Sequence, residues 1–283
     1  MRIFALPLVV LTTLIATASA GYTCAGPDAR TQPPVGSIVV DPTGAYSGSF
    51  RNGYTCNTKS YADNEVTITQ AKAQKDILPE IKNGRNSLTS TLLLKSNNVR
   101  TYNLNVANTA GKFLQDGQAV AVDIEGDNYG FYACNISGYQ DTVYANKGRE
   151  VFARSYISGA VDFVFGSLAA AWFDPSYFVF NNTRVFGSYG NSSSDLGRPW
   201  HPYSRVVWQN SELGDSINTD GWQIWDNSNS TANVSFLEFN NRGPGAATDK
   251  RVSFGKVAKA DVDITELFGE NYKNEWWVDH TFL

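Results

Sequence analysis

The sequence ISGYQDTVY at residues 136–144 is followed by ISGAVDFVF at residues 157–165, so that one short pattern is written twice. The two copies align without a gap, and matched residues are 21 positions apart (157 minus 136). A repeat of roughly 20 to 30 residues, built from β-branched and aromatic runs with Gly and Asn between them, is typical of a solenoid coil. The apolar runs are too short for a helix. The pattern therefore predicts an all-β fold, a parallel β-helix.

The repeat also places two carboxyl groups side by side. Equivalent positions on successive coils stack like neighbouring parallel strands, about 4.8 Å apart. Asp141 and Asp162 are the one ionisable pair at the same place in both copies. Two carboxylates at that distance cannot both ionise cheaply, so one keeps a proton and can act as an acid while the other stays ionised. Aspartate is also a good turn residue, and the repeat alone does not decide between these two interpretations.

Amides, one arginine and aromatic rings accompany the two aspartates. Gln140 precedes the first aspartate, and Gln118 opens an apolar run one coil earlier. Neutral N–H donors beside a carboxylate nucleophile suit a developing oxyanion. The guanidinium of Arg198 can hold a carboxylate ionised and oriented. Flat rings on which sugars can stack come from Trp200, Phe165 and Tyr144.

Length and composition indicate a secreted protein. The 283 residues suit one large domain, and 42% hydrophobic residues exclude a disordered chain. Residues 1–20 have the order of a secretory signal peptide, with Arg2 at the start, an apolar run over residues 3–15 and small residues at 18–20. We therefore expect residues 21–283 to form a single β-helix domain, with a short helix and an aromatic tail that cap it. No other run is long enough to span a bilayer.

The charge of the chain bears on its partners. Without Arg2, 22 basic residues face 27 acidic ones, a net charge of −5. A surface of that sign argues against nucleic acid as a partner, and we expect a monomer that binds neither nucleic acid nor membrane. Five Asn-x-Ser/Thr sequons agree with secretion and predict some glycosylation: Asn135, Asn181, Asn191, Asn229 and Asn233.

Cysteines and histidines offer little for metal chemistry. The three cysteines leave one unpaired. Cys24 with Cys56 is the more plausible disulfide, and Cys134 is expected to be a small core residue. His201 and His280 are the only histidines, and the cysteines lack ligand spacing. The sequence also lacks the Gly-x-Ser-x-Gly pattern of serine hydrolases. We expect neither a metal nor a cofactor.

The remaining elements are predicted from short patterns. Residues 67–83 are compatible with a helix interrupted by a proline. Apolar runs predict strands at residues 37–40, 91–94, 99–106, 119–124, 177–181, 205–209 and 234–239. Three of these runs end in Asn-Asn or Gln-Asn, which we interpret as the bend that closes a coil.

The chain also resembles a known family. GQAVA at 117–121, GYQDTVY at 138–144, GAVDFVFG at 159–166 and LGRPW at 196–200 are similar to the four signature blocks of the pectin methylesterases, in the same order. Further similarity, to the fungal members above all, lies in GWQIW at 221–225 and WVD at 277–279. The four blocks together are highly specific.

The resemblance implies a fold, a reaction and a role for each residue. The fold would be a right-handed, pectin lyase-like parallel β-helix, and the reaction hydrolysis of galacturonate methyl esters in pectin, without metal or cofactor. Asp162 would be the nucleophile and Asp141 the acid and base. Gln118 and Gln140 would form the oxyanion hole, Arg198 would orient Asp162, and the sugar cleft would be lined by Trp200, Phe165 and Tyr144.

Two segments are shorter than the resemblance implies. The opening coils have no clear counterpart over residues 41–69, and about one central coil is missing between Trp172 and Tyr177. Two alternatives therefore stay open beside an active esterase. One is a catalytically inactive pectin-binding β-helix, and the other is a glycoside hydrolase of the polygalacturonase type, since paired carboxylates also cleave glycosidic bonds.

Overall fold

The computed structural model describes residues 59–283 apart from residues 65, 167, 170–176 and 226–230. The chain divides into two compact units. One contains the chain up to Phe165 together with Lys273–Leu283, and the other is Gly166–Tyr272. The predicted signal peptide, the strand at 37–40, the Cys24–Cys56 pair and the shortened central coil lie outside the described residues. The single domain over residues 21–283 stays a prediction.

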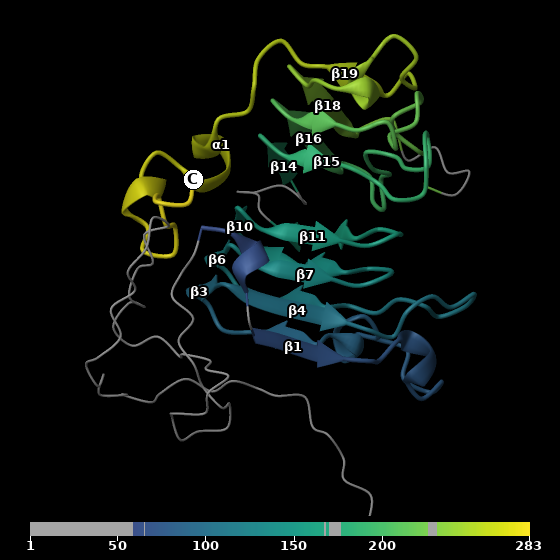
Figure 1. The fold of residues 1–283 in the computed structure, drawn as a ribbon, viewed down its shortest axis with the longest axis vertical. Helices are drawn as coiled ribbons and strands as arrows, with labels where there is room; N and C mark the ends of the chain where they lie inside the picture. The colour runs from purple at the N-terminus through teal and green to yellow at the C-terminus, as the bar shows by residue number, and fades with distance from the viewer. Residues whose placement is uncertain (1–58, 65, 167, 170–176, 226–230) are drawn as a thin grey trace, which may run out of the picture. The chain divides into compact units, whose positions relative to one another are not determined.

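The first unit consists of parallel ladders that wind around one core. In Figure 1 the arrows of β1, β4, β7 and β11 lie one above another as successive rungs. These strands are β1 (Val66–Gln70), β4 (Leu104–Asn108), β7 (Asn135–Ser137) and β11 (Tyr156–Ser158). A second ladder contains β3 (Val99–Tyr102), β6 (Tyr129–Tyr132) and β10 (Glu150–Ala153). A third contains β2 (Leu92–Leu94), β5 (Val122–Ile124), β8 (Val143–Ala145) and β12 (Val164–Phe165). The short β9 is Lys147–Gly148.

The 21-residue repeat is the register of these ladders. Ile136 pairs with Ile157 in one ladder, and Val143 pairs with Val164 in another. The matched apolar side chains therefore stack inside the coil, where each coil shields the apolar side chains of its neighbour from water. The buried members of this core are Val106, Ala121, Val122, Ile124, Tyr129, Phe131, Cys134, Ile136 and Val143. Cys134 is a free, buried thiol, as predicted, and burial raises its pKa to about 12.

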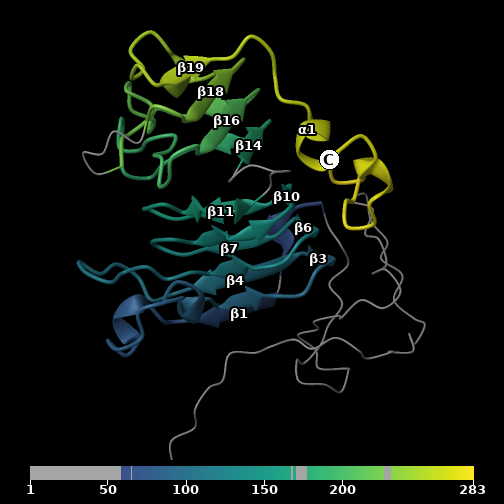
Figure 2. The same ribbon diagram turned by 180° about the vertical axis from the view of Figure 1, so that it is seen from behind.

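The second unit repeats the design with coils of 28 and 30 residues (205 minus 177; 235 minus 205). Its main sheet contains β14 (Tyr177–Asn181), β16 (Arg205–Gln209), β18 (Ser235–Phe239) and β19 (Gly255–Val257), all parallel (Figure 2). A shorter pair contains β15 (Arg184–Val185) and β17 (Glu212–Leu213), and β13 is Leu168–Ala169. The predicted fold class, an all-β parallel β-helix with very little helix, is confirmed.

Asparagines close the coils of the second unit, as the sequence predicted. Asn182, Asn210 and Asn240 follow β14, β16 and β18 and adopt φ values of 51°, 52° and 47°. Asparagine tolerates this left-handed region better than most side chains. Their amides also form a ladder, since Asn240 Nδ2 donates to Asn210 Oδ1 at 2.9 Å and Asn210 Nδ2 donates to Asn181 Oδ1 at 3.1 Å.

The predicted helix over residues 67–83 is wrong. Residues 66–70 instead form β1, which pairs along its whole length with β4, and a single 3₁₀ turn follows at Gln74–Asp76. Pairing with a neighbouring coil satisfies the backbone of this segment, which overrides a weak helical pattern. The other 3₁₀ turns are Tyr61–Asp63, Ser87–Thr89, Pro244–Ala246 and Tyr272–Asn274, and the one α-helix of the described chain is α1 (Ile264–Phe268).

The aromatic tail packs on the side of the first unit. Trp277 and Phe282 are buried, and the Tyr132 hydroxyl donates to the Trp277 carbonyl at 2.7 Å. Trp276 is 52% exposed with its ring 5.1 Å from the guanidinium of Arg100. The tail thus covers the ladder of β3, β6 and β10. Among the described residues no helix has the length and apolar character to cross a bilayer.

Candidate active site

The two aspartates occupy the same corner of adjacent coils. Gln140 bridges to Val161 in parallel, and the amide of Asp141 donates to the Val161 carbonyl at 3.0 Å. The neighbouring pairs in the ladders keep the same offset, so Asp162 follows Asp141 at the next level. Asp141 is buried and Asp162 is partly exposed. The side-by-side placement predicted from the repeat is the one the structure has.

Both aspartates adopt a left-handed backbone, with φ of 62° at Asp141 and 44° at Asp162. Residues in this region are enriched at turns and at functional sites. The geometry therefore fits the turn interpretation and the chemical one equally well. What it adds is that the two aspartates occupy one corner of the coil, at successive levels.

Two glycines make the corner tight. A Cβ on Gly138 would lie 2.9 Å from Thr142 Oγ1, and a Cβ on Gly159 would lie 2.5 Å from Phe163 Cβ. Side chains larger than hydrogen do not fit there without displacing a neighbour. Thr142 also holds the corner from within, because its hydroxyl donates to the Ser158 carbonyl at 3.0 Å. The Gly-x-x-Asp pattern in both copies of the repeat is thus explained by this turn, which needs a glycine three residues before the aspartate.

The two glutamines lie on neighbouring coils beside the aspartate corner. The amide of Ala119 donates to the Gln140 carbonyl at 3.1 Å, which places Gln118 and Gln140 on adjacent levels. Gln140 Oε1 lies 3.1 Å from the position of a Cβ on Gly117. Gln118 Oε1 is buried and accepts no hydrogen bond within the described part of the chain. An amide without a protein partner at that oxygen can turn toward a bound group.

An aromatic row continues the site along the third ladder. Tyr144 pairs with Phe165, and their rings stack with centroids 4.4 Å apart and 7° between planes. Val143 belongs to the core and Val164 packs against it, so the alternating neighbours Tyr144 and Phe165 face outward. The row places an aromatic ring three residues beyond each aspartate.

Arg198 and Trp200 belong to the second unit. The ring of Trp225 lies 4.0 Å from the Arg198 guanidinium, and Trp200 is 36% exposed and stacks on His201 with centroids 4.7 Å apart. The structure therefore brings together six of the predicted site residues in the first unit and the other two in the second. That Arg198 reaches Asp162 stays a prediction.

One buried aspartate near the site was not predicted from the sequence. Asp123 pairs with Tyr144, 21 residues later, and so occupies the aromatic row one coil earlier. Its carboxyl is fully buried, and Oδ2 accepts no hydrogen bond from the described residues. Burial raises its pKa from 3.8 to about 6, although hydrogen bonds from Ser87 and Asn146 oppose the shift. Asp123 precedes Tyr144 by the 21 residues of the repeat, and this interval could have predicted that the two residues are neighbours on adjacent coils.

Replacing Asp123 with asparagine is expected to raise the Tm at pH 7.5 and to change it little at pH 4. The native pKa of about 6 lies above the ordinary 3.8, so the folded protein binds this proton more tightly than the unfolded chain. Stability therefore falls as the pH rises from about 4 to about 6, and a shift of about two pKa units corresponds to about 3 kcal/mol. Asparagine has no charge to bury. Calorimetric scans at the two pH values measure the difference.

Asp127→Asn is the matched control with the opposite sign. Burial raises the Asp127 pKa, but hydrogen bonds from Arg149 lower it more, so the net pKa lies below 3.8. The ionised carboxylate accepts from Arg149 Nε at 3.2 Å and Nη2 at 3.0 Å. This variant should lose Tm at pH 7.5. An equal rise of the Asp123→Asn protein at both pH values would mean that its charge is not the cause.

Comparison with known proteins gives one consistent result. The family model described as Pectinesterase matches residues 64–185 and 174–272. A pectinesterase from Aspergillus aculeatus is 37% identical over 261 residues, which cover 82% of this chain and 76% of that protein. A pectinesterase from Aspergillus niger is 36% identical over the same shares of the two chains.

Solved structures agree with the sequence matches. The pectin methylesterase from Aspergillus niger in penultimately deglycosylated form is 32% identical, with a TM-score of 0.69 over 81% of this chain and 80% of that one. Its deglycosylated form gives a TM-score of 0.73 at 28% identity, over 89% of this chain and 99% of that one. A pectin methylesterase from carrot is 26% identical, with a TM-score of 0.55 over 70% of this chain and 71% of that one.

Proposed function

This chain belongs to the pectinesterase family, and from that premise we propose that it hydrolyses methyl esters of galacturonate units in pectin through Asp162 and Asp141. Family membership makes it a carboxylic ester hydrolase. The stacking of Asp141 and Asp162 at one corner of adjacent coils is the observation that carries the assignment of roles.

The first half of the reaction forms an acyl-enzyme. The Asp162 carboxylate attacks the ester carbonyl carbon, and the carbonyl oxygen takes up the negative charge. The side-chain N–H groups of Gln118 and Gln140 donate to this oxyanion. As the tetrahedral intermediate collapses, Asp141 gives its proton to the departing methoxide. Methanol leaves, and the galacturonyl group remains bound to Asp162 as an anhydride.

The second half consumes one water. Asp141, now ionised, takes a proton from a water that attacks the anhydride carbonyl. The bond to Asp162 breaks, which restores its carboxylate and releases the galacturonyl group as a free carboxylic acid, which then loses its proton to the solvent. The burial of Asp141 supports its role as the acid, because burial favours the protonated form of a carboxylic acid. No step requires a metal or a cofactor.

The remaining predicted residues bind and orient. Arg198 would hold Asp162 ionised with its attacking oxygen toward the ester. Tyr144 and Phe165, stacked at 4.4 Å and facing outward, would support the flat faces of sugar rings, with Trp200 contributing a third ring. Pectin is thus the proposed partner.

Methanol release from highly methylated pectin tests the proposed function. The purified mature protein should release methanol and new carboxylates without producing reducing ends in the same tube. New reducing ends would favour a glycoside hydrolase instead. Absence of methanol from a protein whose circular dichroism shows folded β structure, with retained pectin binding, would identify an inactive pectin-binding β-helix.

We also propose that the protein is a secreted, monomeric glycoprotein. Among its sequons Asn191 is exposed in a turn, whereas Asn135 lies inside the ladder of β4, β7 and β11 with a buried Oδ1. A glycan therefore fits Asn191 and not Asn135. Peptide mapping of protein recovered from the culture medium, before and after glycan removal, checks secretion and occupancy together. A glycan on Asn135 would contradict the assignment.

A further inference from the structure

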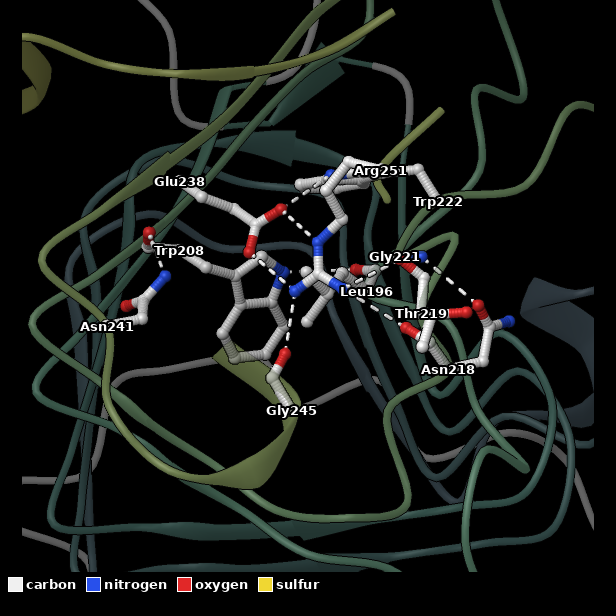
Figure 3. Close-up of polar contacts among 10 residues, drawn as sticks. All are labelled: Leu196, Trp208, Asn218, Thr219, Gly221, Trp222, Glu238, Asn241, Gly245 and Arg251. Carbon is white, nitrogen blue, oxygen red and sulfur yellow. Dashed lines mark hydrogen bonds and ion pairs between the residues drawn. The ribbon is translucent and has the colours of Figure 1, made fainter. Parts of the chain in front are cut away.

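A buried ion pair lies within the second unit, between β18 and the segment before β19. Glu238 and Arg251 have side chains that are 3% and 4% exposed. Arg251 Nε donates to Glu238 Oε1 at 2.8 Å, and Arg251 Nη2 donates to Glu238 Oε2 at 2.9 Å. The indole of Trp222 donates to the same Oε1 at 3.1 Å (Figure 3). Both carboxylate oxygens are therefore occupied by donors from fixed groups.

Arg251 uses its other donors on backbone carbonyls. Nη1 donates to the carbonyls of Asn218 and Thr219 at 3.1 and 3.2 Å, and Nη2 donates to that of Gly245 at 2.6 Å (Figure 3). All five N–H groups of the guanidinium are thus paired. Gly221 packs directly against this side chain, since a Cβ there would lie 2.4 Å from Arg251 Cδ. The fork fixes the turn that leads into Trp222.

That turn holds the segment carrying Arg198. The Leu196 amide donates to the Gly221 carbonyl at 2.6 Å, and the Gln223 amide donates to the Gly197 carbonyl at 3.0 Å. Gly197 bridges to Trp222 in parallel. From the other side, the Trp208 indole donates to the Leu196 carbonyl at 3.0 Å. Leu196 and Gly197, the two residues before Arg198, are therefore hydrogen-bonded to the segment 221–223, whose Trp222 also contacts the ion pair.

The segment that begins at Gly221 also contains Trp225, the residue whose ring lies beside Arg198. Trp225 lies three residues after Trp222, with its ring 4.0 Å from the Arg198 guanidinium. A cation at this distance from an indole is held by the charge distribution of the ring. Backbone pairing thus fixes the position of the Arg198 Cα atom, and Trp225 restrains the guanidinium group at the end of the side chain.

A buried ion pair is weak as a source of stability, because desolvation offsets much of the attraction. Its fixed geometry is the property that an active site can use. We propose that Trp225, supported by the Glu238–Arg251 pair, is a positioning residue for Arg198 in ester hydrolysis. This inference rests on the role proposed for Arg198 above. The effect of Trp225 on ester hydrolysis is exerted through the arginine, although its ring also lies 6.4 Å from that of Trp200, centroid to centroid.

A double-mutant cycle between Trp225 and Arg198 tests the inference. Trp225→Leu in the native background should lower kcat about tenfold while KM changes by less than about threefold. In an Arg198→Ala background the same substitution should have no further effect on kcat. Trp276→Leu removes another tryptophan that lies beside an arginine, Arg100, and should leave kcat unchanged. An equal loss in both backgrounds would overturn the inference, since Trp225 would then act independently of Arg198.

The ion pair is tested with shape-conserving variants. Glu238→Gln keeps the side-chain volume and removes the charge, and Arg251→Lys keeps the charge and removes the fork. Each should lower kcat severalfold in the native background and have no effect on kcat in the Arg198→Ala background. Variants that stay folded with native kcat would show that the pair does not position Arg198.

A spectroscopic measurement separates this inference from the proposed function. The Arg198 Nε–Hε resonance, assigned with Arg198→Lys, should carry a ring-current shift that disappears in Trp225→Leu and changes in Glu238→Gln. This holds whether or not the protein releases methanol. If the ring-current shifts are present but no methanol is released, the proposed function is wrong and the positioning of Arg198 by Trp225 stands. If methanol is released but the shifts are absent, the proposed function stands and the positioning is wrong.

Discussion

Replacing Asp162 with asparagine is expected to lower methanol release from pectin by at least about 10⁴-fold, the scale of loss seen when a catalytic nucleophile is removed. Asparagine nearly matches aspartate in volume and tolerates the left-handed backbone, so the φ of 44° at this corner needs no rearrangement. It has no carboxylate to attack the ester. Quantifying methanol under saturating pectin measures the loss as kcat.

The other aspartates provide graded controls. Asp141→Asn should cost about 10²- to 10⁴-fold, because it removes acid and base catalysis but leaves the nucleophile. Asp116 is the third described aspartate with a positive φ, 49°, and lies exposed in a loop. Asp116→Asn should therefore keep native kcat. If Asp162→Asn kept a tenth of the native rate, the nucleophile would have to be another group.

Replacing Glu238 with alanine is expected to destabilise the protein by about 3–5 kcal/mol. The substitution leaves the Arg251 guanidinium buried, with a side-chain exposure of 4%, and without its carboxylate partner. It also leaves the Trp222 indole N–H without an acceptor it has in the native protein. The loss should appear as a lower Tm and a lower midpoint of urea unfolding.

Two further variants distinguish a buried unpaired charge from loss of packing. Replacing Glu238 and Arg251 together by methionine should recover much of the lost stability, because the double variant buries no charge. Glu212→Ala breaks ion pairs with Arg184 at 3.5 Å and Arg242 at 3.8 Å whose side chains are 43% to 73% exposed. Its effect should stay below about 1 kcal/mol. A loss as large as that of Glu238→Ala would mean that burial is not what matters.

The 21-residue repeat predicted the ladder register residue by residue. Ile136 stacks on Ile157 and Val143 on Val164 because a solenoid repeats its neighbours at a fixed interval along the chain. The strands at Tyr177–Asn181 and Arg205–Gln209 have the predicted bounds, since each apolar run ends at an asparagine or glutamine pair whose last residue adopts a positive φ. In these places local pattern and tertiary contact coincide.

The sequence misled where a segment lacks a repeat of its own. Residues 67–83 form a strand and a 3₁₀ turn because β4 offers a paired edge, and no local signal reports that edge. Asp123 was missed for a related reason. Its neighbours in the row, Tyr144 and Phe165, are aromatic, so the row does not repeat one residue type.

The sequence by itself determined the β-helix and the stacking of Asp141 on Asp162, because both depend on a fixed interval along the chain. It also determined the family, through four short blocks in a fixed order. The tertiary structure alone decided that Trp225 lies over Arg198 and that Glu238 meets Arg251. These pairs are 27 and 13 residues apart (225 minus 198; 251 minus 238) and follow no repeat. Their meeting depends on how loops of unequal length pack within the coils, which is a property of the folded core and not of any local pattern.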